Sequence, residues 1–284
     1  MDAAMRPPLL FEFDPTRDEH AYFLGLLATD GCITKASRNR GRVTFELSAV
    51  DAAVLRSLVQ IMPYSGSLSG RVRTTNFRKS HESAILTFHD LRLRQRLMQY
   101  GYAAGKKSGT VGPPLCAYNE SGFWRGVLDG DGSMGITAGD HAFVSVVTAS
   151  DPLRNSYVDY VTKITGARPN PKRNARDYIY NIVLFDETAQ CLVRHLYRDD
   201  LIAIPRKVAG ATLVAGWRRP PGRARISFER RRWTPDEDRC VLSELPQKMI
   251  ATELGRTEHS INLRRWRLRA SLGDAALAND HSSM

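Results

Sequence analysis

Two segments of the chain carry apolar residues at helical spacing and then end in aspartate and glycine. They read AYFLGLLATDGCI, at positions 21–33, and GFWRGVLDGDGSM, at positions 122–134. The spacing predicts two helices of about three turns, each ending at a glycine that we expect to adopt a left-handed conformation. Carboxylates at the negative end of a helix are unfavourable by up to about 1 kcal/mol each. We therefore expect a positive group to face them.

The two segments are copies of one pattern. Aligned on their glycines, Gly25 matches Gly126 and Asp30 matches Asp131, an offset of 131 − 30 = 101. Glycine inside a helix costs about 1 kcal/mol relative to alanine, a cost that a close approach of two helix backbones would justify. If the two helices pack together, their C-terminal ends lie side by side. The two aspartates are then expected to converge on one small region.

The sequence after each helix repeats as well. Positions 42–62 and 142–164 each read as a strand, an aspartate suited to cap a helix (Asp51 and Asp151) and an amphipathic helix. A polar, basic hairpin-like segment, another helix and a lysine follow in each half, with 207 − 107 = 100 positions between Lys107 and Lys207. A period near 100 indicates a duplicated domain. The order helix, two strands, helix, two strands, helix predicts an α+β fold with an antiparallel sheet.

The charge of the chain points to a polyanionic partner. The 284 residues carry a formal net charge of +11 with a pI near 9.7, which favours nucleic acid. No apolar run approaches the ~20 residues of a membrane span, and the first residues lack a signal-peptide pattern. The four cysteines form no C-x-x-C pair, so we do not expect a zinc or disulfide framework. We expect a cytoplasmic location, in association with the nucleoid.

Two converging carboxylates suit a divalent cation. Hard oxygen ligands with few others nearby favour Mg²⁺, which keeps its waters and borrows oxygens from a phosphate substrate. Two such ions can activate a water and stabilise the leaving oxygen at a scissile phosphate. An exposed turn is the alternative interpretation of DGDGS. A calcium loop starting at Asp129 is not expected, because Met134 occupies its glycine position and Asp140 its glutamate position.

The repeated motif, FLGLLATDG in the first copy and VLDGDG in the second, resembles that of the single-chain LAGLIDADG homing endonucleases over about positions 18–215. The resemblance implies a pseudo-twofold, duplicated αββαββα saddle, and a monomer that cuts both strands of a long DNA target. It also implies that Asp30 and Asp131 share two or three Mg²⁺ ions, with the backbone carbonyls of Thr29 and Gly130 as helpers. Asp129 has no counterpart in the first copy and is treated as secondary.

The resemblance adds three candidate catalytic side chains. A polar residue on a central strand is matched by Glu46, while Val146 occupies that place in the second half. Lys107 and Lys207 are candidates for a basic role, steadying charge on the phosphate. An outward strand position for Glu46, and ordinary surface positions for the lysines, remain open alternatives.

The open face of an antiparallel sheet can lie in the major groove, where base pairs are distinguishable. The candidates for phosphate or guanine contacts lie in the basic hairpin-like segments. They are Arg38, Arg40, Arg42, Arg71, Arg73, Arg78 and Lys79 in the first half, and Arg168, Lys172, Arg173 and Arg176 in the second.

Beyond position 216 the composition becomes rich in arginine, proline and glycine, and then a helix, a glycine turn and a basic helix follow. This part resembles a Myb/SANT-like helix-turn-helix module, for which a protein-interaction module is the alternative. Its expected core is Trp233, Leu242, Ile250, Ala251, Leu254, Ile261 and Trp266. Its expected DNA contacts are Arg223 and Arg225 in the linker, and Arg256, Thr257, His259, Asn262, Arg264, Arg265 and Arg267 in the module.

The sequence thus predicts an N-terminal arm (1–17), two LAGLIDADG halves (18–115 and 116–215), a basic linker (216–230), a helix-turn-helix domain (231–271) and a disordered tail (272–284). The expected function is a site-specific, Mg²⁺-dependent double-strand DNA endonuclease. A non-catalytic DNA-binding regulator on the same scaffold and an RNA-splicing maturase are the alternatives.

Overall fold

The structure, a computed structural model, describes residues 13–37, 40–74, 80–223 and 233–280. The chain forms two compact units, residues 1–221 (unit 1) and 222–284 (unit 2). Within the described ranges, no helix combines the length and apolar character needed to cross a bilayer.

The first half of unit 1 has the predicted element order. It consists of α1 (Asp18–Thr29), β1 (Gly31–Ile33), β2 (Val43–Ser48), a 3₁₀ turn (Ala49–Asp51), α2 (Ala52–Ile61), β3 (Gly66–Arg73), β4 (His81–Phe88) and α3 (Leu91–Gln99). The four strands form an antiparallel sheet in the order β1-β2-β4-β3. The predicted α+β architecture is confirmed.

The second half repeats this order with one strand fewer and one helix more. It consists of α4 (Glu120–Asp131), β5 (Gly132–Ile136), β6 (Ala142–Thr148), α5 (Asp151–Thr165), β7 (Tyr180–Phe185), α6 (Asp186–Leu196) and α7 (Pro205–Gly216), with the sheet order β5-β6-β7. Where the first half has its outermost strand, a single bridge joins Arg173 and Tyr180. Pro169 and Pro171 lie in the segment before this bridge, and proline has no N–H to donate to a sheet.

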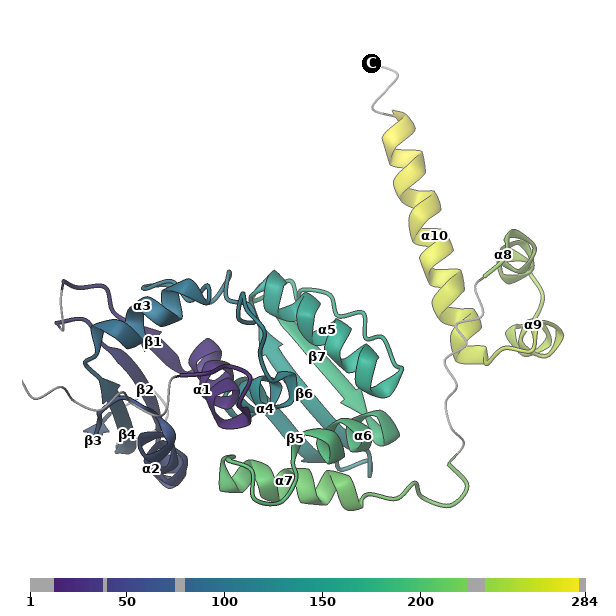
Figure 1. The fold of residues 1–284 in the computed structure, drawn as a ribbon. Coiled ribbons are helices and arrows are strands. Elements are labelled where there is room, and N and C mark those ends of the chain that lie inside the picture. Colours follow the sequence, from purple (N-terminus) through teal and green to yellow (C-terminus); the bar gives the residue numbers. More distant parts are fainter. Residues whose placement is uncertain (1–12, 38–39, 75–79, 224–232, 281–284) are drawn as a thin grey trace, which may run out of the picture. The chain divides into compact units, whose positions relative to one another are not determined.

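Helices α1 and α4 cross in direct backbone contact between the two sheets (Figure 1). A Cβ on Gly25 would overlap the carbonyl oxygen of Phe123, and a Cβ on Gly126 would lie 3.0 Å from the Gly25 Cα. Arg125 on α4 is fully buried and pairs with Asp18 on α1. The two mid-helix glycines therefore allow the close approach that the sequence predicted.

The glycines that follow the motif aspartates have a different role from the predicted one. Gly132 has φ −88° and ψ 161°, and Gly31 is likewise not among the residues with positive φ. A Cβ on Gly31 would lie 2.7 Å from the Leu27 Cα, and one on Gly132 would lie 2.8 Å from the Leu128 Cα. The expectation of a left-handed helix end is wrong: glycine is needed here because the first strand residue folds back against the last helical turn.

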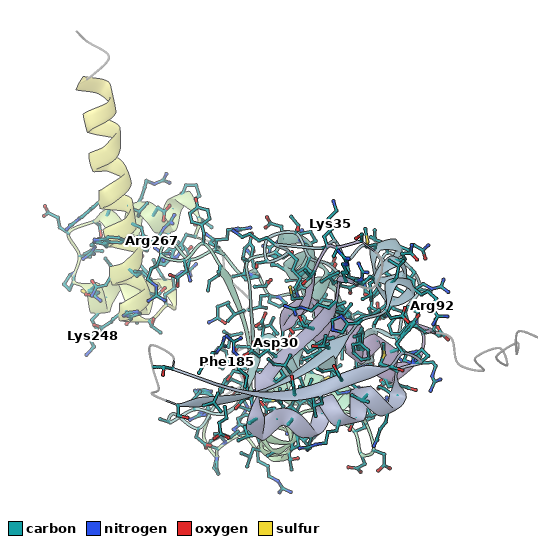
Figure 2. The ribbon with its side chains drawn as sticks, turned by 90° about the vertical axis from the view of Figure 1, so that its left-hand side faces the viewer. Asp30, Lys35, Arg92, Phe185, Lys248 and Arg267 are labelled. Carbon is teal, nitrogen blue, oxygen red and sulfur yellow. The ribbon has the colours of Figure 1, made fainter. Side chains whose placement is uncertain are left out.

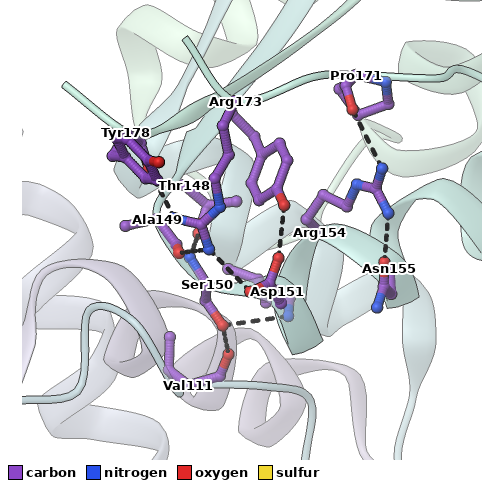
Figure 3. A network of polar contacts seen from close by, with 12 residues as sticks. Val111, Thr148, Ala149, Ser150, Asp151, Arg154, Asn155, Pro171, Arg173 and Tyr178 are labelled. Carbon is purple, nitrogen blue, oxygen red and sulfur yellow. Dashed lines mark hydrogen bonds and ion pairs between the residues drawn. The ribbon is translucent and has the colours of Figure 1, made fainter. Parts of the chain in front are cut away.

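Asp51 and Asp151 do not cap helices through their side chains. In the second half Ser150 is the N-cap of α5, and its Oγ accepts a hydrogen bond from the Leu153 N–H. The Asp151 carboxylate instead accepts from Tyr180 Oη (2.5 Å). It also pairs with Arg173 (2.8 Å), as Figure 3 shows. Asp51 makes no capping hydrogen bond either. The capping prediction for these two residues is wrong.

Each sheet buries one face and leaves the other open. On β2 the residues Val43, Phe45 and Leu47 are buried, and the residues between them are partly exposed. The buried faces join α1, α4 and the other helices of unit 1 in one continuous hydrophobic core. The alternation leaves one open face on each sheet.

Unit 2 is a three-helix module, with α8 (Pro235–Leu242), α9 (Gln247–Leu254) and α10 (Glu258–Asp280). Thr234 and Glu237 form a capping box at the start of α8, and Gly255 ends α9 in a left-handed conformation. The core consists of Val241, Ile250, Ala251 and Ile261, with Trp233, Cys240, Leu254 and Leu268 packed against it.

Two predictions for unit 2 are wrong. Leu242 and Trp266 were expected in its core but are 38% and 68% exposed, and the neighbouring Val241 is buried in the place expected for Leu242. The tail was predicted to be disordered from position 272, but α10 extends through Asp280.

Candidate functional site

The two motif aspartates end the crossing helices, so that their carboxylates meet. Asp30 is the C-cap of α1 and Asp131 is the last residue of α4. A Cβ on Gly130 would lie 2.7 Å from Asp30 Oδ2, so this carboxylate lies against the last turn of α4. Burial first, and then repulsion from Asp131, raises the pKa of Asp30 to about 6. The pKa of Asp131 is also raised, by desolvation.

A lysine from each half binds the end of the motif helix in the same half. Lys107 donates to the carbonyl oxygens of Leu27 and Thr29 (3.1 Å to the latter), and Lys207 donates to those of Leu128 (3.3 Å) and Gly132. Leu27 and Leu128 are equivalent in the repeat, since 128 − 27 = 101. The lysines thus supply positive charge at the negative helix ends.

The lysines are also coupled electrostatically to the carboxylates. Burial lowers the pKa of Lys107 to about 8, while Asp131 and Asp30 act in the opposite direction. Burial lowers the pKa of Lys207 as well, followed by the neighbouring charge of Arg206. The structure therefore brings four of the predicted residues into one site, two carboxylates and two ammonium groups.

Asp129 is a buried anchor of the helix crossing. Its carboxylate accepts hydrogen bonds from Tyr22 Oη (2.7 Å), Tyr197 Oη (2.7 Å) and the Ile204 N–H (2.6 Å). Desolvation raises its pKa although these donors oppose the shift. Asp129 thus joins α4 to α1 and to the chain between α6 and α7, and it does not point to the exposed site.

Glu46 lies on the open face of the first sheet. Continuing the Gly31–Phe45 register by one pair puts Asp30 opposite Glu46. The Glu46 carboxylate accepts from Ser83 Oγ (2.8 Å) and pairs with Arg73 (3.3 Å) and Arg71 (3.8 Å). The site therefore has a neighbouring carboxylate in the first half.

The position equivalent to Glu46 in the second half is Val147. Gly132 pairs with Val146 just as Gly31 pairs with Phe45, so the residue opposite Asp131 is Val147. Val146 was expected to occupy this place, but it is only 1% exposed and lies in the core. The two halves of the site are therefore not chemically equivalent.

Sequence reasoning missed an ion pair that joins the two halves beside the site. Arg206, which precedes Lys207 on α7, donates through Nε to both oxygens of Asp51, at 3.0 and 2.9 Å. The Asp51 side chain is only 3% exposed. The equivalent Asp151 pairs within its own half (Figure 3). The only sign of this pair in the sequence is the repeat of Asp51 at Asp151, and the position of both residues before a helix predicts a helix cap instead.

The predicted DNA contacts of the first half lie partly on the open face. Arg71 and Arg73 are on β3, and Arg40 and Arg42 are exposed before β2. Three other predicted contacts, Arg38, Arg78 and Lys79, lie outside the described residues.

The predicted contacts of the second half differ in availability. Arg168 and Lys172 are exposed, although Arg168 also pairs with Asp159 (3.1 Å), and the Arg176 side chain is 86% exposed. Arg173 is held by Asp151, by the carbonyl oxygens of Ala149 and Tyr178, and by the ring of Tyr180 (Figure 3). Arg173 therefore organises the segment that replaces the missing strand.

In unit 2 the predicted contacts divide in the same way. Thr257, His259, Asn262 and Arg267 are exposed. Arg256 is instead 10% exposed, pairs with Glu237 and lies 3.8 Å from the Trp233 ring centroid, and Arg264 pairs with Asp238. Arg265 donates to the Val241 carbonyl oxygen. Arg223 is described and has partners of its own, and Arg225 lies outside the described residues.

The donor set at the helix ends fits a magnesium ion that keeps most of its waters. Asp30 and Asp131 offer hard carboxylate oxygens, and a cation between them would offset the repulsion that, after burial, raises the pKa of Asp30. Among the described residues there is no group of three or more His, Cys, Asp or Glu placed to hold an ion alone. The predicted Thr29 carbonyl already accepts from Lys107.

Comparison with solved structures identifies the fold. The chain is similar to the homing endonuclease I-WcaI bound to its DNA recognition sequence, with a TM-score of 0.52, 11% identity, and coverage of 74% of this chain and 95% of that chain. Other similar structures are mesophilic variants of the homing endonuclease I-DmoI (TM-score 0.46, 14% identity, 69% and 97% coverage) and the N-terminal LAGLIDADG domain of DUF199/WhiA (0.45, 12%, 70% and 91%).

No protein-family model matches the chain, and no curated protein matches its sequence. At 11% identity the likeness to I-WcaI concerns the fold. The chain has the LAGLIDADG endonuclease-like fold.

Proposed function

We propose that the protein is a site-specific DNA endonuclease that hydrolyses both strands of a long, imperfectly symmetric duplex with Mg²⁺. The observation that carries the proposal is the meeting of Asp30 and Asp131 at the ends of two crossing helices, with Lys107 and Lys207 beside them. A single chain with two unlike halves suits a monomer whose target need not be palindromic.

The residues of the site have separable roles in this proposal. Asp30 and Asp131 would hold two or three Mg²⁺ ions, with the carbonyls of Thr29 and Gly130 nearby. Bound magnesium would supply an activated water and neutralise charge on the leaving oxygen. With a pKa of about 8, Lys107 stays mostly protonated at pH 7. It and Lys207 hold the helix ends in place and place positive charge near the phosphate as it becomes pentacovalent.

Glu46 is proposed to orient a water molecule next to the metal in the first half alone. Glu46 is opposite Asp30 when the strand register is continued by one pair, and its carboxylate pairs with Arg71 and Arg73 in the free protein. Bound DNA would compete for these arginines and release the carboxylate toward the site.

We propose that unit 2 is a helix-turn-helix module that adds affinity or extends the target. The left-handed Gly255 turn between α9 and α10, and the exposed His259, Asn262 and Arg267 on α10, support this role. Arg256 and Arg264 are reassigned from DNA contacts to the stability of the module, because Glu237 and Asp238 engage them.

Cleavage of a randomised duplex library tests the proposal. The full chain is incubated with the library and Mg²⁺, the broken ends are sequenced, and single-turnover rates are measured on the recovered site. We expect breaks in both strands and a rate loss of about 100-fold or more in Asp131→Asn, since a catalytic metal ligand is removed. Asp199→Asn is the matched control, because Asp199 is exposed in the segment between α6 and α7.

The outcomes separate the alternatives. Breaks that persist in Asp131→Asn would contradict the assigned site. Tight duplex binding without breaks would indicate a non-catalytic DNA-binding regulator, and preferential binding of structured intron RNA would indicate a maturase.

A further inference from the structure

The open faces of the two sheets differ in chemistry. On the first sheet the strand register puts polar and charged side chains on this face, and among them are Glu46, Ser67, Ser69, Arg71 and Arg73. On the second sheet the register puts a different set on the equivalent face: Phe143, Ser145 and Val147 on β6, and Asn181, Val183 and Phe185 on β7. The second set contains four large apolar side chains and no charge.

These apolar side chains are accessible to a partner. Phe185 is 51% exposed and Val147 is 36% exposed, while Phe143 and Val183 are partly exposed. The strands β5, β6 and β7 are all described, and the outward positions of β5 are Ser133 and Gly135, which are also uncharged. Grouped apolar side chains on a surface mark a binding site more often than scattered ones do.

The position of the open face of the second sheet indicates that it contacts the same partner, DNA, as the open face of the first sheet. The pairs Gly31–Phe45 and Gly132–Val146 are equivalent, so both open faces begin directly beside a motif aspartate. Figure 2 labels Asp30 at the end of α1 and Phe185 on the second sheet. The segment preceding β7 carries exposed Arg168, Lys172 and Arg176, which suit phosphates flanking a neutral surface.

We propose that the open face of the second sheet reads thymine methyl groups in the major groove, so that the half-site bound by this half is rich in A·T pairs. The thymine C5-methyl is the apolar feature of the major groove, and apolar side chains contact it. Arg71 and Arg73 on the first face are suited to guanine, which accepts two hydrogen bonds from an arginine. This inference rests on the proposed DNA binding but does not depend on cleavage.

Replacing thymine with deoxyuridine removes only the methyl group and tests the inference. A binding site is first selected from random duplexes by the full chain in EDTA, so that no cleavage is needed. Selections with Arg71→Ala and Phe185→Ser show which half-site each sheet reads. Each contacted thymine changed to deoxyuridine in the second half-site is expected to weaken binding about fourfold, the value of one buried methyl. The same change in the first half-site is expected to have less than a twofold effect.

Phe185→Ser connects the effect to this face. The variant is expected to bind the selected site more weakly and to lose the difference between thymine and deoxyuridine. Met98→Ser, at a 57% exposed position on α3, is the matched control and is expected to keep both.

The outcomes distinguish this inference from the proposed function. Specific duplex binding with no loss on deoxyuridine substitution, or a guanine-rich second half-site, would overturn this inference alone. Absence of binding to any duplex would overturn the proposed function, and this inference with it.

Discussion

Replacing Gly25 with alanine adds one methyl group at the point where α1 and α4 touch. The new Cβ would lie 2.9 Å from both the Phe123 carbonyl carbon and the Val127 nitrogen, and closer to the Phe123 oxygen. Favourable contacts between carbon atoms begin at about 3.5 Å. Because these neighbours are backbone atoms, no side chain can rotate away. The helices must separate by about 1 Å or more, because the new Cβ would lie only 2.0 Å from the Phe123 oxygen. A gap of about 0.5–1 Å already forfeits about a quarter to a half of the dispersion energy of the affected contacts.

The expected result is a net loss of stability. Overpacking costs about 1–3 kcal/mol and alanine returns about 1 kcal/mol through its helix propensity, which leaves a net loss of about 0–2 kcal/mol. Because the overlap is with backbone atoms that cannot move aside, we expect the upper half of this range, a net loss of at least about 1 kcal/mol. Urea unfolding followed by circular dichroism, and by the fluorescence of buried Trp124, measures it. A loss of this size corresponds to about 2–4 °C in Tm for a unit of this length.

Gly216→Ala is the matched control for this substitution. Gly216 also lies in a helix, but an added Cβ would meet nothing within 4 Å. The control is therefore expected to be as stable as the original protein or up to about 1 kcal/mol more stable. Equal unfolding midpoints for the two variants would refute the close crossing of the helices.

Three further predictions concern other contacts. Asp129→Asn is expected to lower the free energy of unfolding by about 1–3 kcal/mol, because its amide N–H₂ would face one of the three hydrogen-bond donors of Asp129. Urea unfolding measures this loss, and an unchanged midpoint would contradict the assigned hydrogen bonds. Arg206→Gln leaves the buried Asp51 carboxylate unpaired. A double-mutant cycle with Asp51→Asn is expected to give a coupling free energy of about 1–3 kcal/mol. Losses of unfolding free energy that simply add in the double variant would rule out the pair. Arg256→Ala is expected to lower the Tm of unit 2 by losing the pair with Glu237 and the contact with Trp233; an unchanged Tm with weakened DNA binding would restore its assignment as a DNA contact.

The sequence was sufficient where the relevant interaction is local or repeated. The apolar spacing predicted the two motif helices, although not the conformation of their ends, and the mid-helix glycines predicted their close crossing. The duplication predicted the rest of the fold, because two segments with the same order of helices and strands are expected to fold in the same way. The missing strand of the second half was not predicted, although Pro169 and Pro171 were a visible signal.

The sequence was insufficient where the partner of a side chain comes from a distant element. Asp51 looks like a helix cap by position, and only the fold brings Arg206 to it. Arg173 and Arg256 look like DNA contacts by charge, and only the fold shows that Asp151 and Glu237 engage them. An error of one residue in aligning the two halves also moves the predicted residue to the other face of the sheet, as with Val146, which is buried, and Val147, which is on the open face.

The titration of Asp30 by NMR, in the original protein and in Asp131→Asn, tests most directly whether the two motif carboxylates converge. Burial and repulsion from Asp131 are expected to give Asp30 a pKa of about 6, and removing the charge of Asp131 is expected to lower this pKa measurably. An Asp30 pKa near 4 in both proteins, or one that Asp131→Asn leaves unchanged, would contradict the account.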